Sequence, residues 1–219
     1  SGDKTVYIYK TADMGETWTS MDDGNIEGFA RVIRQDPVNH DLLFAGTEFG
    51  LYISVDGGTQ WAAFSGGLPP VSVMEIAIHP READAVLATH GRGIYIIDDI
   101  TPLRELTADI LNKKVAFLKS EPVIISLQRS QQHWSGGGEF VGSNPSEVAN
   151  ITYYLKRRHI FGDMRVEIYD ADSNLVKSLP GGKRRGINRV EWAMREKPPR
   201  VSRSRVIAGG AMSGPMVPE

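Results

Sequence analysis

Cysteine is absent from this 219-residue sequence, and no large excess of either charge is present. The lack of cysteine excludes disulfides, thiolate metal sites and a cysteine nucleophile, but it leaves the cellular compartment open. The net charge is −2 with both signs interspersed, which argues against nucleic acid or an anionic membrane as a partner. No stretch approaches the roughly 18 apolar residues of a membrane span, so membrane insertion is not expected.

Long helical patterns are also scarce. The sequence is 41% hydrophobic, which is sufficient for folded cores, and it contains 23 glycines and 12 prolines. This composition favours many short strands joined by tight turns. We therefore predict an all-β protein.

An internal repeat is the most informative feature that is present. One period predicts four strands, at residues 29–34, 42–45, 51–54 and 61–64, and the pattern restarts at 72–78, 85–88 and 93–97. A period near 40 to 45 residues is typical of a four-stranded propeller blade. Residues 1–105 are accordingly predicted to form about two blades of a partial β-propeller. Residues that match at an offset of 43, with no gap, are Asp13 and Asp56, Trp18 and Trp61, Pro37 and Pro80, Gly50 and Gly93, and Tyr52 and Tyr95.

Each repeat contains a turn built around an aspartate. The aspartate side chain is able to accept hydrogen bonds from backbone N–H groups of its own turn, glycine permits a positive φ, and tryptophan packs into the sheet. Because each aspartate recurs at the same place, we interpret it as structural rather than catalytic or metal-binding. The turns read Thr11-Ala-Asp13-Met-Gly15-Glu-Thr17-Trp18 and Ser54-Val-Asp56-Gly-Gly58-Thr-Gln60-Trp61, and a third copy keeps Asp99 but lacks the glycine and tryptophan.

These turns resemble the Asp box of BNR-repeat β-propellers, a group that includes sortilin-type ectodomains, sialidases and xyloglucanase-type glycoside hydrolases. The resemblance implies the closing blades of such a propeller and a secreted or cell-envelope location. It implies little about function, because these families range from peptide-binding receptors to glycosidases. Two blades leave open edges, so we expect the ring to be completed by remaining blades of the same polypeptide or by other copies of the chain.

The C-terminal half predicts a different module. We expect a connecting strand and a Gly/Ser-rich linker over residues 106–147, including apolar runs at 115–118 and 123–127. Residues 148–219 are predicted to form a small, incomplete Ig-like β-sandwich with strands at 149–155, 164–169, 175–179 and 186–192, followed by a flexible arm. The order of its strands resembles the immunoglobulin-like module of flagellar hook-capping proteins.

Candidate ligand residues lie on the turns that follow the second strand of each predicted blade. These are Glu48, His90 and Arg92. His90 and Arg92 are able to contact an anionic or peptide ligand or to serve only as exposed turn residues. Asp23 is expected on an inter-blade connection at the same face of the propeller as Glu48. A glycosidase needs two carboxylates about 5 to 10 Å apart, which Glu48 and Asp23 would be able to supply, with ordinary solvated turn residues as the alternative. We assign no catalytic residue, metal or cofactor. Lys183–Arg185 is interpreted as a solvated hairpin tip, with an acidic partner as the alternative.

Three functional hypotheses follow from these observations. The leading one is a non-catalytic binding or scaffolding region of an exported multidomain propeller protein, which presents a propeller face to protein or carbohydrate. The alternative is the closing part of a glycoside hydrolase whose catalytic carboxylates lie mostly outside this chain. The third is an assembly interface in which open blade edges pair between copies.

Overall fold

A computed structural model describes residues 5–123 and 148–195 of the chain. The chain forms two compact units, Ser1–Lys113 and Lys114–Glu219. Most of the predicted strand at 123–127, the Gly/Ser-rich linker and the C-terminal arm lie outside the described residues.

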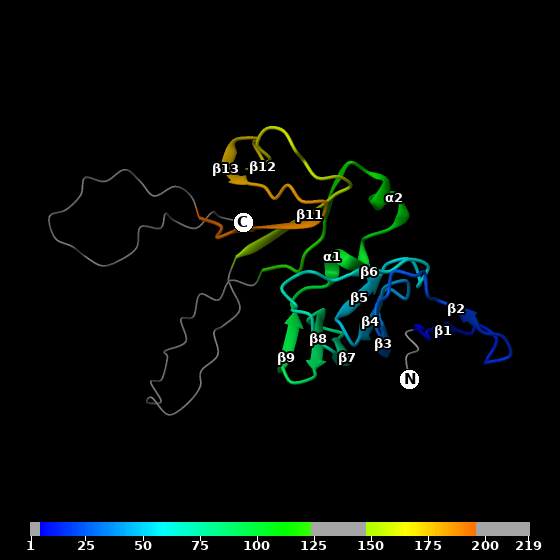
Figure 1. The fold of residues 1–219 in the computed structure, drawn as a ribbon. Helices are drawn as coiled ribbons and strands as arrows, with labels where there is room; N and C mark the ends of the chain where they lie inside the picture. The colour runs from blue at the N-terminus through cyan, green and yellow to red at the C-terminus, as the bar shows by residue number, and fades with distance from the viewer. Residues whose placement is uncertain (1–4, 124–147, 196–219) are drawn as a thin grey trace, which may run out of the picture. The chain divides into compact units, whose positions relative to one another are not determined.

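The described part of the first unit contains three antiparallel sheets, in which consecutive strands are neighbours (Figure 1). The predicted strands of the repeat are present, within one or two residues at each end. The first sheet contains β1 (Tyr9–Lys10) and β2 (Thr19–Ser20); the second contains β3 (Ala30–Gln35), β4 (Leu43–Thr47), β5 (Leu51–Ser54) and β6 (Ala62–Ala63); the third contains β7 (Val73–His79), β8 (Asp84–Thr89) and β9 (Ile94–Ile97).

The 43-residue offset of the sequence recurs in the backbone. A bulge interrupts the pairing of β3 with β4 between Ala30 and Val32, and the equivalent bulge interrupts the pairing of β7 with β8 between Val73 and Glu75. A bulge adds one residue to a strand and bends it, so two bulges at matching positions give the sheets the same local shape. The second and third sheets are therefore structural repeats as well as sequence repeats.

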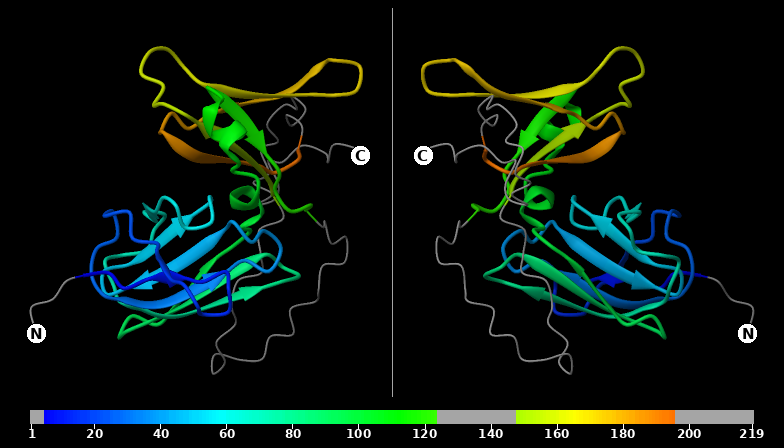
Figure 2. Two further views of the ribbon diagram at one scale, coloured as in Figure 1. Left: turned by 90° about the vertical axis from the view of Figure 1, so that its right-hand side faces the viewer. Right: turned by 90° about the vertical axis from the view of Figure 1, so that its left-hand side faces the viewer.

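Neighbouring sheets of the first unit pack face to face and share hydrophobic cores, as the layers in Figure 2 show. Successive side chains of a strand point to opposite faces. In β4 this places Phe44 in the core shared with the third sheet, and Leu43 and Ala45 in the core shared with the first. Because both faces of β4 and β5 are covered, these strands are buried along their whole length.

Two short helices follow β9, α1 (Thr101–Arg104) and α2 (Ala108–Asn112). The sequence pattern predicts no helix there. Pro102 in the first turn favours the start of α1, and the Thr107 hydroxyl accepts a hydrogen bond from the Ile110 N–H at the start of α2. Single helical turns of this length are too short to produce the periodic apolar pattern by which helices are predicted.

The second unit contains two antiparallel sheets that share one core. Tyr153, Leu155 and Val190 from the larger sheet pack with Val166 from the smaller one. The apolar run that was expected to connect the two domains forms an edge strand, β10, which pairs with β11. The larger sheet has the order β10 (Val115–Leu118), β11 (Ala149–Leu155) and β14 (Gly186–Trp192), and the smaller one contains β12 (Arg165–Tyr169) and β13 (Leu175–Pro180).

The fold is thus all-β apart from the two short helices. It consists of several small antiparallel sheets, and within the described residues none of them closes on itself.

Candidate functional site

The first aspartate turn is stabilised by a network of hydrogen bonds centred on Asp13. Its Oδ1 accepts from the Thr17 N–H at 2.9 Å and from the Thr11 hydroxyl at 2.8 Å, and its Oδ2 accepts from the Thr17 hydroxyl. The Thr11 hydroxyl oxygen in turn accepts from the Gly15 N–H at 2.8 Å. A φ of 98° at Gly15 explains why glycine is required at this position.

The second turn repeats this network 43 residues later. Asp56 Oδ1 accepts from the Ser54 hydroxyl at 2.8 Å and from the Gln60 N–H at 2.9 Å, and the Ser54 hydroxyl oxygen accepts from the Gly58 N–H at 2.9 Å. Glutamine in place of threonine keeps the backbone N–H bond to the carboxylate but does not reproduce the hydroxyl bond that Thr17 donates to Asp13. Both carboxylates are therefore occupied in holding their own turns.

The third aspartate has another role. Asp99 adopts a φ of 54°, its N–H donates to Asp84 Oδ1 at 3.1 Å, and its own Oδ1 accepts from the Thr101 N–H at 3.1 Å. The residue thus ends β9 and leads the chain into α1. The loss of the glycine and tryptophan in this copy coincides with that change from a strand turn to a helix start.

The tryptophans of the two complete turns differ in environment. Trp61 is 4% exposed and packs in the core between the first and second sheets, where its indole N–H donates to the Met21 carbonyl oxygen at 2.8 Å. Trp18 is 60% exposed, and its indole N–H donates to the Gly15 carbonyl oxygen within its own turn. The described residues place no sheet over Trp18.

The electrostatics of the first turn provide a direct test. Hydrogen bonds from the Thr17 hydroxyl and N–H, followed by that from Thr11, hold the pKa of Asp13 at about 2, below its ordinary value of 3.8. A carboxyl group with a depressed pKa stabilises the folded turn above pH 3.8, and this contribution is lost as the pH falls through about 2.

We expect Thr17→Val to raise the pKa of Asp13 from about 2 toward 3.8, because the hydroxyl donor makes the largest contribution. A carbon-detected NMR titration of the side-chain carboxyl measures this value. Thr59→Val is the matched control, since the Thr59 hydroxyl donates to the Asp56 carbonyl oxygen in the second turn. An Asp13 pKa that stays near 2 in Thr17→Val would contradict the assignment.

The candidate ligand residues lie on equivalent turns of two neighbouring sheets. Glu48 is half-buried on the β4–β5 turn, and His90 and Arg92 are exposed on the β8–β9 turn. The Glu48 N–H donates to the Phe29 carbonyl oxygen at 3.1 Å, and the His90 N–H donates to that of Ser72 at 2.9 Å. Each turn is therefore attached in the same way to the segment that leads into its own sheet.

An exposed aromatic ring lies beside Glu48. Phe49 is exposed on the same turn and its ring lies against Gly28, where an added Cβ atom would be only 2.8 Å from the Phe49 ring. Gly28 also adopts a φ of 80°, so the site favours glycine on two grounds. The sequence pattern gives Phe49 no role, because this contact joins the β4–β5 turn to the segment before β3, which is distant in the sequence.

Asp23 does not lie with Glu48, contrary to the sequence prediction. Its Oδ2 accepts from the Trp61 N–H at 2.8 Å, and Trp61 leads into β6 beside the end of β5 that is distant from the β4–β5 turn. The four residues of β5 separate the two positions by roughly 10 to 13 Å. The segment that connects β2 to β3 therefore passes over the second aspartate turn, at the end of the sheets opposite to Glu48.

The pKa of Asp23 also makes it unsuitable as a general acid. Partial burial raises the pKa, but hydrogen bonds from Trp61 and Asn25 outweigh that effect and leave the pKa below its ordinary value. A glycosidase acid requires a raised pKa. Within the described residues, no group of three or more His, Cys, Asp or Glu side chains is arranged to hold a metal ion.

Charge is distributed unevenly between the two units. Residues 1–113 contain 8 Lys and Arg against 17 Asp and Glu, whereas residues 114–219 contain 17 against 10. The net charge of −2 therefore combines −9 in the first unit with +7 in the second. Counting the charges of each half of the sequence would have detected this difference. Because the second unit has a net positive charge, the small net charge of the whole chain does not argue against an anionic partner for that unit.

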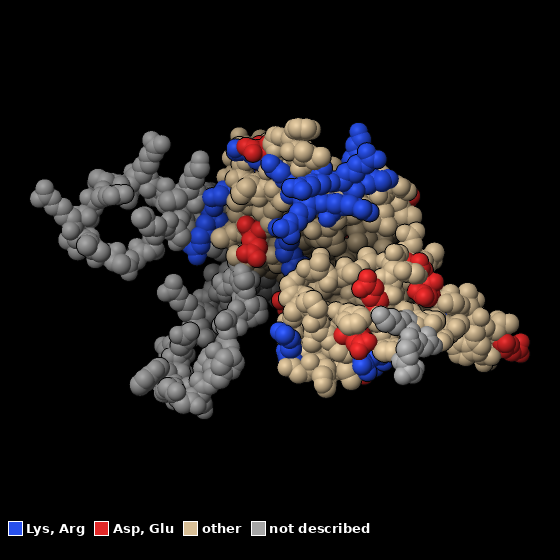
Figure 3. Space-filling model, viewed as in Figure 1, with Lys and Arg blue, Asp and Glu red and all other residues tan. Residues whose placement is uncertain are grey.

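Two loops bring basic residues of the second unit together. The His159 N–H donates to the Lys183 carbonyl oxygen at 2.9 Å, and the Lys183 ammonium donates to the Gly162 carbonyl oxygen at 2.6 Å. These bonds place the Lys-Arg-Arg run at 156–158 near the Lys-Arg-Arg run at 183–185. Figure 3 shows Lys and Arg side chains gathered on this unit.

No protein-family model matches this sequence, and neither a curated protein nor a solved structure is significantly similar to it. The described helices include none that is long and apolar enough to cross a membrane.

Proposed function

We propose that the chain is a non-catalytic binding or scaffolding region of a BNR-repeat β-propeller protein, and that its first unit presents one end of its stacked sheets to a protein or carbohydrate ligand. The observation that carries this proposal is the structural repeat. Two meander sheets with matching bulges pack face to face, and equivalent aspartate turns recur after the third strand of successive repeats. Face-to-face packing of small antiparallel meanders is how propeller blades are arranged.

The turns at the other end of the sheets support a ligand surface there. Glu48, His90 and Arg92 add a carboxylate, an imidazole and a guanidinium, and the exposed Phe49 ring adds an apolar platform. Aromatic rings with neighbouring polar groups are suited to sugars and to peptide side chains. Loops on a rigid β scaffold are the usual place for such sites.

The carboxylates of this unit support binding rather than hydrolysis. Asp13, Asp56 and Asp23 accept backbone N–H groups, and Asp36 is buried in an ion pair with Arg104. Glu48 is thus left without a second carboxylate in a suitable position among these aspartates. Hydrolysis, the glycoside hydrolase alternative, would require a second carboxylate beside Glu48 that is none of these four aspartates.

A glycan array and a peptide array, probed with the whole chain, test this function. We expect Phe49→Ala and Arg92→Ala each to weaken binding of the best ligand by about tenfold or more, because central aromatic and arginine contacts dominate affinity. Met14→Ala is the control, since Met14 is fully exposed on the first aspartate turn at the opposite end of the sheets.

An oligosaccharide hydrolysis assay with the same proteins separates the two functions. We expect no cleavage by the wild type. Cleavage that disappears in Glu48→Gln would overturn the proposal in favour of the glycosidase alternative.

A further inference from the structure

Two large apolar side chains project from the loop between β11 and β12 in the second unit. Phe161 is 84% exposed and Ile160 is 72% exposed, and among the large apolar side chains of the described residues only Met14 is more exposed. Neither Phe161 nor Ile160 is part of the core that the two sheets of this unit share. The packing of the unit therefore gives this apolar tip no role.

One lysine holds the apolar tip in place. The Lys183 carbonyl oxygen accepts from the His159 N–H at 2.9 Å, and the Lys183 ammonium donates to the Gly162 carbonyl oxygen at 2.6 Å. These two bonds fix the residues on both sides of the tip. Gly162 also adopts a φ of 72°, which favours glycine at this bend. The tip is thus presented to the surroundings by a loop of defined conformation.

Cationic residues lie on both sides of the tip. The Lys-Arg-Arg run at 156–158 precedes it in the chain, and the run at 183–185 contains the lysine that holds it. Because β11 ends beside the start of β14, the two runs leave the sheet from neighbouring strands about 5 Å apart. The Lys156 N–H also donates to the Lys114 carbonyl oxygen at 3.1 Å, so the start of β10 adds a further lysine.

Much of this positive charge is not neutralised within the unit. The four arginines of the two runs are exposed, and among the described residues none of the four forms an ion pair. The carboxylate of the loop, Asp163, lies 3.9 Å from the Lys183 ammonium and 3.7 Å from the Arg165 guanidinium, so it offsets other cations. The four arginines are Arg157, Arg158, Arg184 and Arg185.

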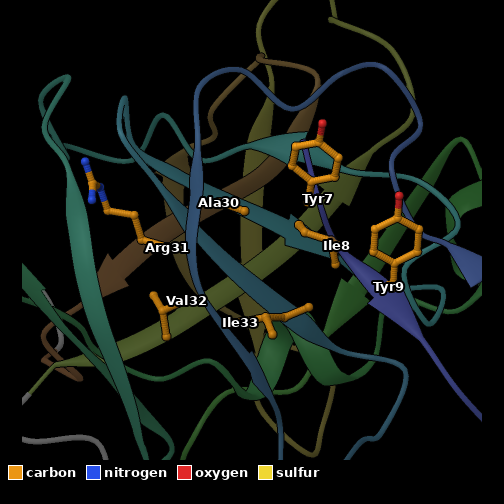
Figure 4. A pocket seen from close by; sticks show the side chains of 7 residues that line it. All are labelled: Tyr7, Ile8, Tyr9, Ala30, Arg31, Val32 and Ile33. Carbon is orange, nitrogen blue, oxygen red and sulfur yellow. The ribbon is translucent and has the colours of Figure 1, made fainter. Parts of the chain in front are cut away.

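The first unit offers much less to an anionic partner. Its net charge is −9, and a pocket of about 240 Å³ between β1 and β3 has a single cation, Arg31, among its lining residues. Figure 4 shows that Arg31 lies across this pocket from Tyr7 and Tyr9. An anionic surface would therefore be attracted to the second unit and repelled by the first.

We propose that the β11–β12 loop docks the second unit on the surface of an anionic lipid bilayer. Ile160 and Phe161 enter the headgroup region, and the two Lys-Arg-Arg runs contact anionic lipids. Apolar side chains at this depth, together with clustered basic residues, attach proteins to a bilayer without crossing it. The contact goes beyond the proposed function, because it uses the second unit and none of the ligand turns.

The composition of the tip favours lipid over nucleic acid. Single-stranded nucleic acids also attract cations, but their bases stack on aromatic rings. Phe161 has such a ring, whereas Ile160 is aliphatic and equally prominent on the loop. An adjacent aliphatic and aromatic pair gains more from transfer out of water than from stacking on a base.

Flotation of the whole chain with lipid vesicles tests the role of charge. We expect binding to vesicles of phosphatidylcholine mixed with phosphatidylglycerol, and much weaker binding to phosphatidylcholine alone. Replacement of Arg157 and Arg158 together by glutamine should weaken binding by about tenfold or more, because each basic residue near an anionic surface adds to the attraction. Arg31→Gln is the control, since Arg31 is an exposed arginine of the first unit.

The same assay tests the apolar tip. Phe161→Ser and Ile160→Ser are each expected to weaken binding by about tenfold, because each removes apolar surface that leaves water on docking. Ile94→Ser is the matched control: Ile94 is 70% exposed, close to the 72% of Ile160, but it lies on β9 of the first unit. All three side chains are exposed, so the variants should remain folded, and thermal unfolding checks this.

The absence of cysteine allows a dye to be attached at one chosen position. Phe161→Cys, labelled with an environment-sensitive dye, should shift its emission to shorter wavelength when the phosphatidylglycerol vesicles are added. Ile94→Cys with the same dye should show no shift. This measurement reports entry of the tip into the bilayer, which flotation alone does not.

Failure of the wild type to bind the phosphatidylglycerol vesicles would overturn the proposal. Binding that the arginine replacements weaken, but that Ile160→Ser and Phe161→Ser leave unchanged, would show a purely electrostatic contact and would also overturn it. A single-stranded oligonucleotide that binds more tightly and displaces the chain from vesicles would identify nucleic acid as the partner instead. None of these outcomes affects the array experiment on the ligand turns.

Discussion

Replacement of Trp61 by alanine is expected to lower the free energy of unfolding by about 3 to 5 kcal/mol. The indole ring fills the core between the first and second sheets, and its N–H bonds the Met21 carbonyl oxygen. The substitution therefore removes a large apolar contact, leaves a cavity and leaves the partly buried Met21 carbonyl oxygen without the indole donor. Urea denaturation monitored by circular dichroism measures the change.

The equivalent substitution in the preceding repeat is the control. Trp18→Ala should cost less than about 1 kcal/mol, because most of the ring is already in contact with water. A similar decrease in the free energy of unfolding for the two variants would contradict this prediction. It would show that tryptophan stabilises the fold through its own turn and not through burial between sheets.

Replacement of Asp36 by alanine is expected to have a comparable effect, about 3 to 5 kcal/mol. Asp36 is fully buried and accepts two hydrogen bonds from the Arg104 guanidinium, at 2.9 and 3.0 Å, together with one from the Asn39 N–H at 2.7 Å. Its removal leaves a largely buried guanidinium without a counter-charge. It also removes one of two attachments of α1 to the β3–β4 turn, the other being the bond from Asn39 Nδ2 to the Arg104 carbonyl oxygen.

An exposed ion pair of the same unit serves for comparison. Arg34 and Glu75 are both about half exposed, so Glu75→Ala should cost less than about 1 kcal/mol. The double variant Asp36→Ala with Arg104→Met should recover part of the loss, since it removes the unpaired charge. No recovery would indicate that the backbone hydrogen bonds of Asp36, and not the ion pair, account for the effect.

The sequence predicts the strands well because their signals are local. Alternating apolar residues and the spaced glycines and aspartates are read within a few positions, and the repeat supplies each signal more than once. The hydrogen bonds of Asp13 and Asp56 follow for the same reason. The Ig-like character of the second unit and the propeller remain predictions beyond the all-β fold.

The features that the sequence does not predict depend on contacts between residues that are distant along the chain. Asp36 and Arg104 are 68 residues apart, and nothing near either residue indicates a partner. The bond of Asp23 to the Trp61 N–H spans 38 residues. It holds the Asp23 carboxylate at the end of the sheets opposite to the predicted ligand face. Such pairs become visible only when the packing of the sheets is known.

The position of β4 and β5 between two covered faces has a consequence for how the first unit opens. In a stack of repeats, each layer is stabilised mainly by its nearest neighbours, so a layer with two neighbours is held more firmly than one at an end. Opening of the first unit then proceeds inward from its outer layers, and the central layer is the last to lose its order. A segment that docks against an outer layer would convert it into an inner one, and would extend the cooperative part of the fold without any change in the central sheet.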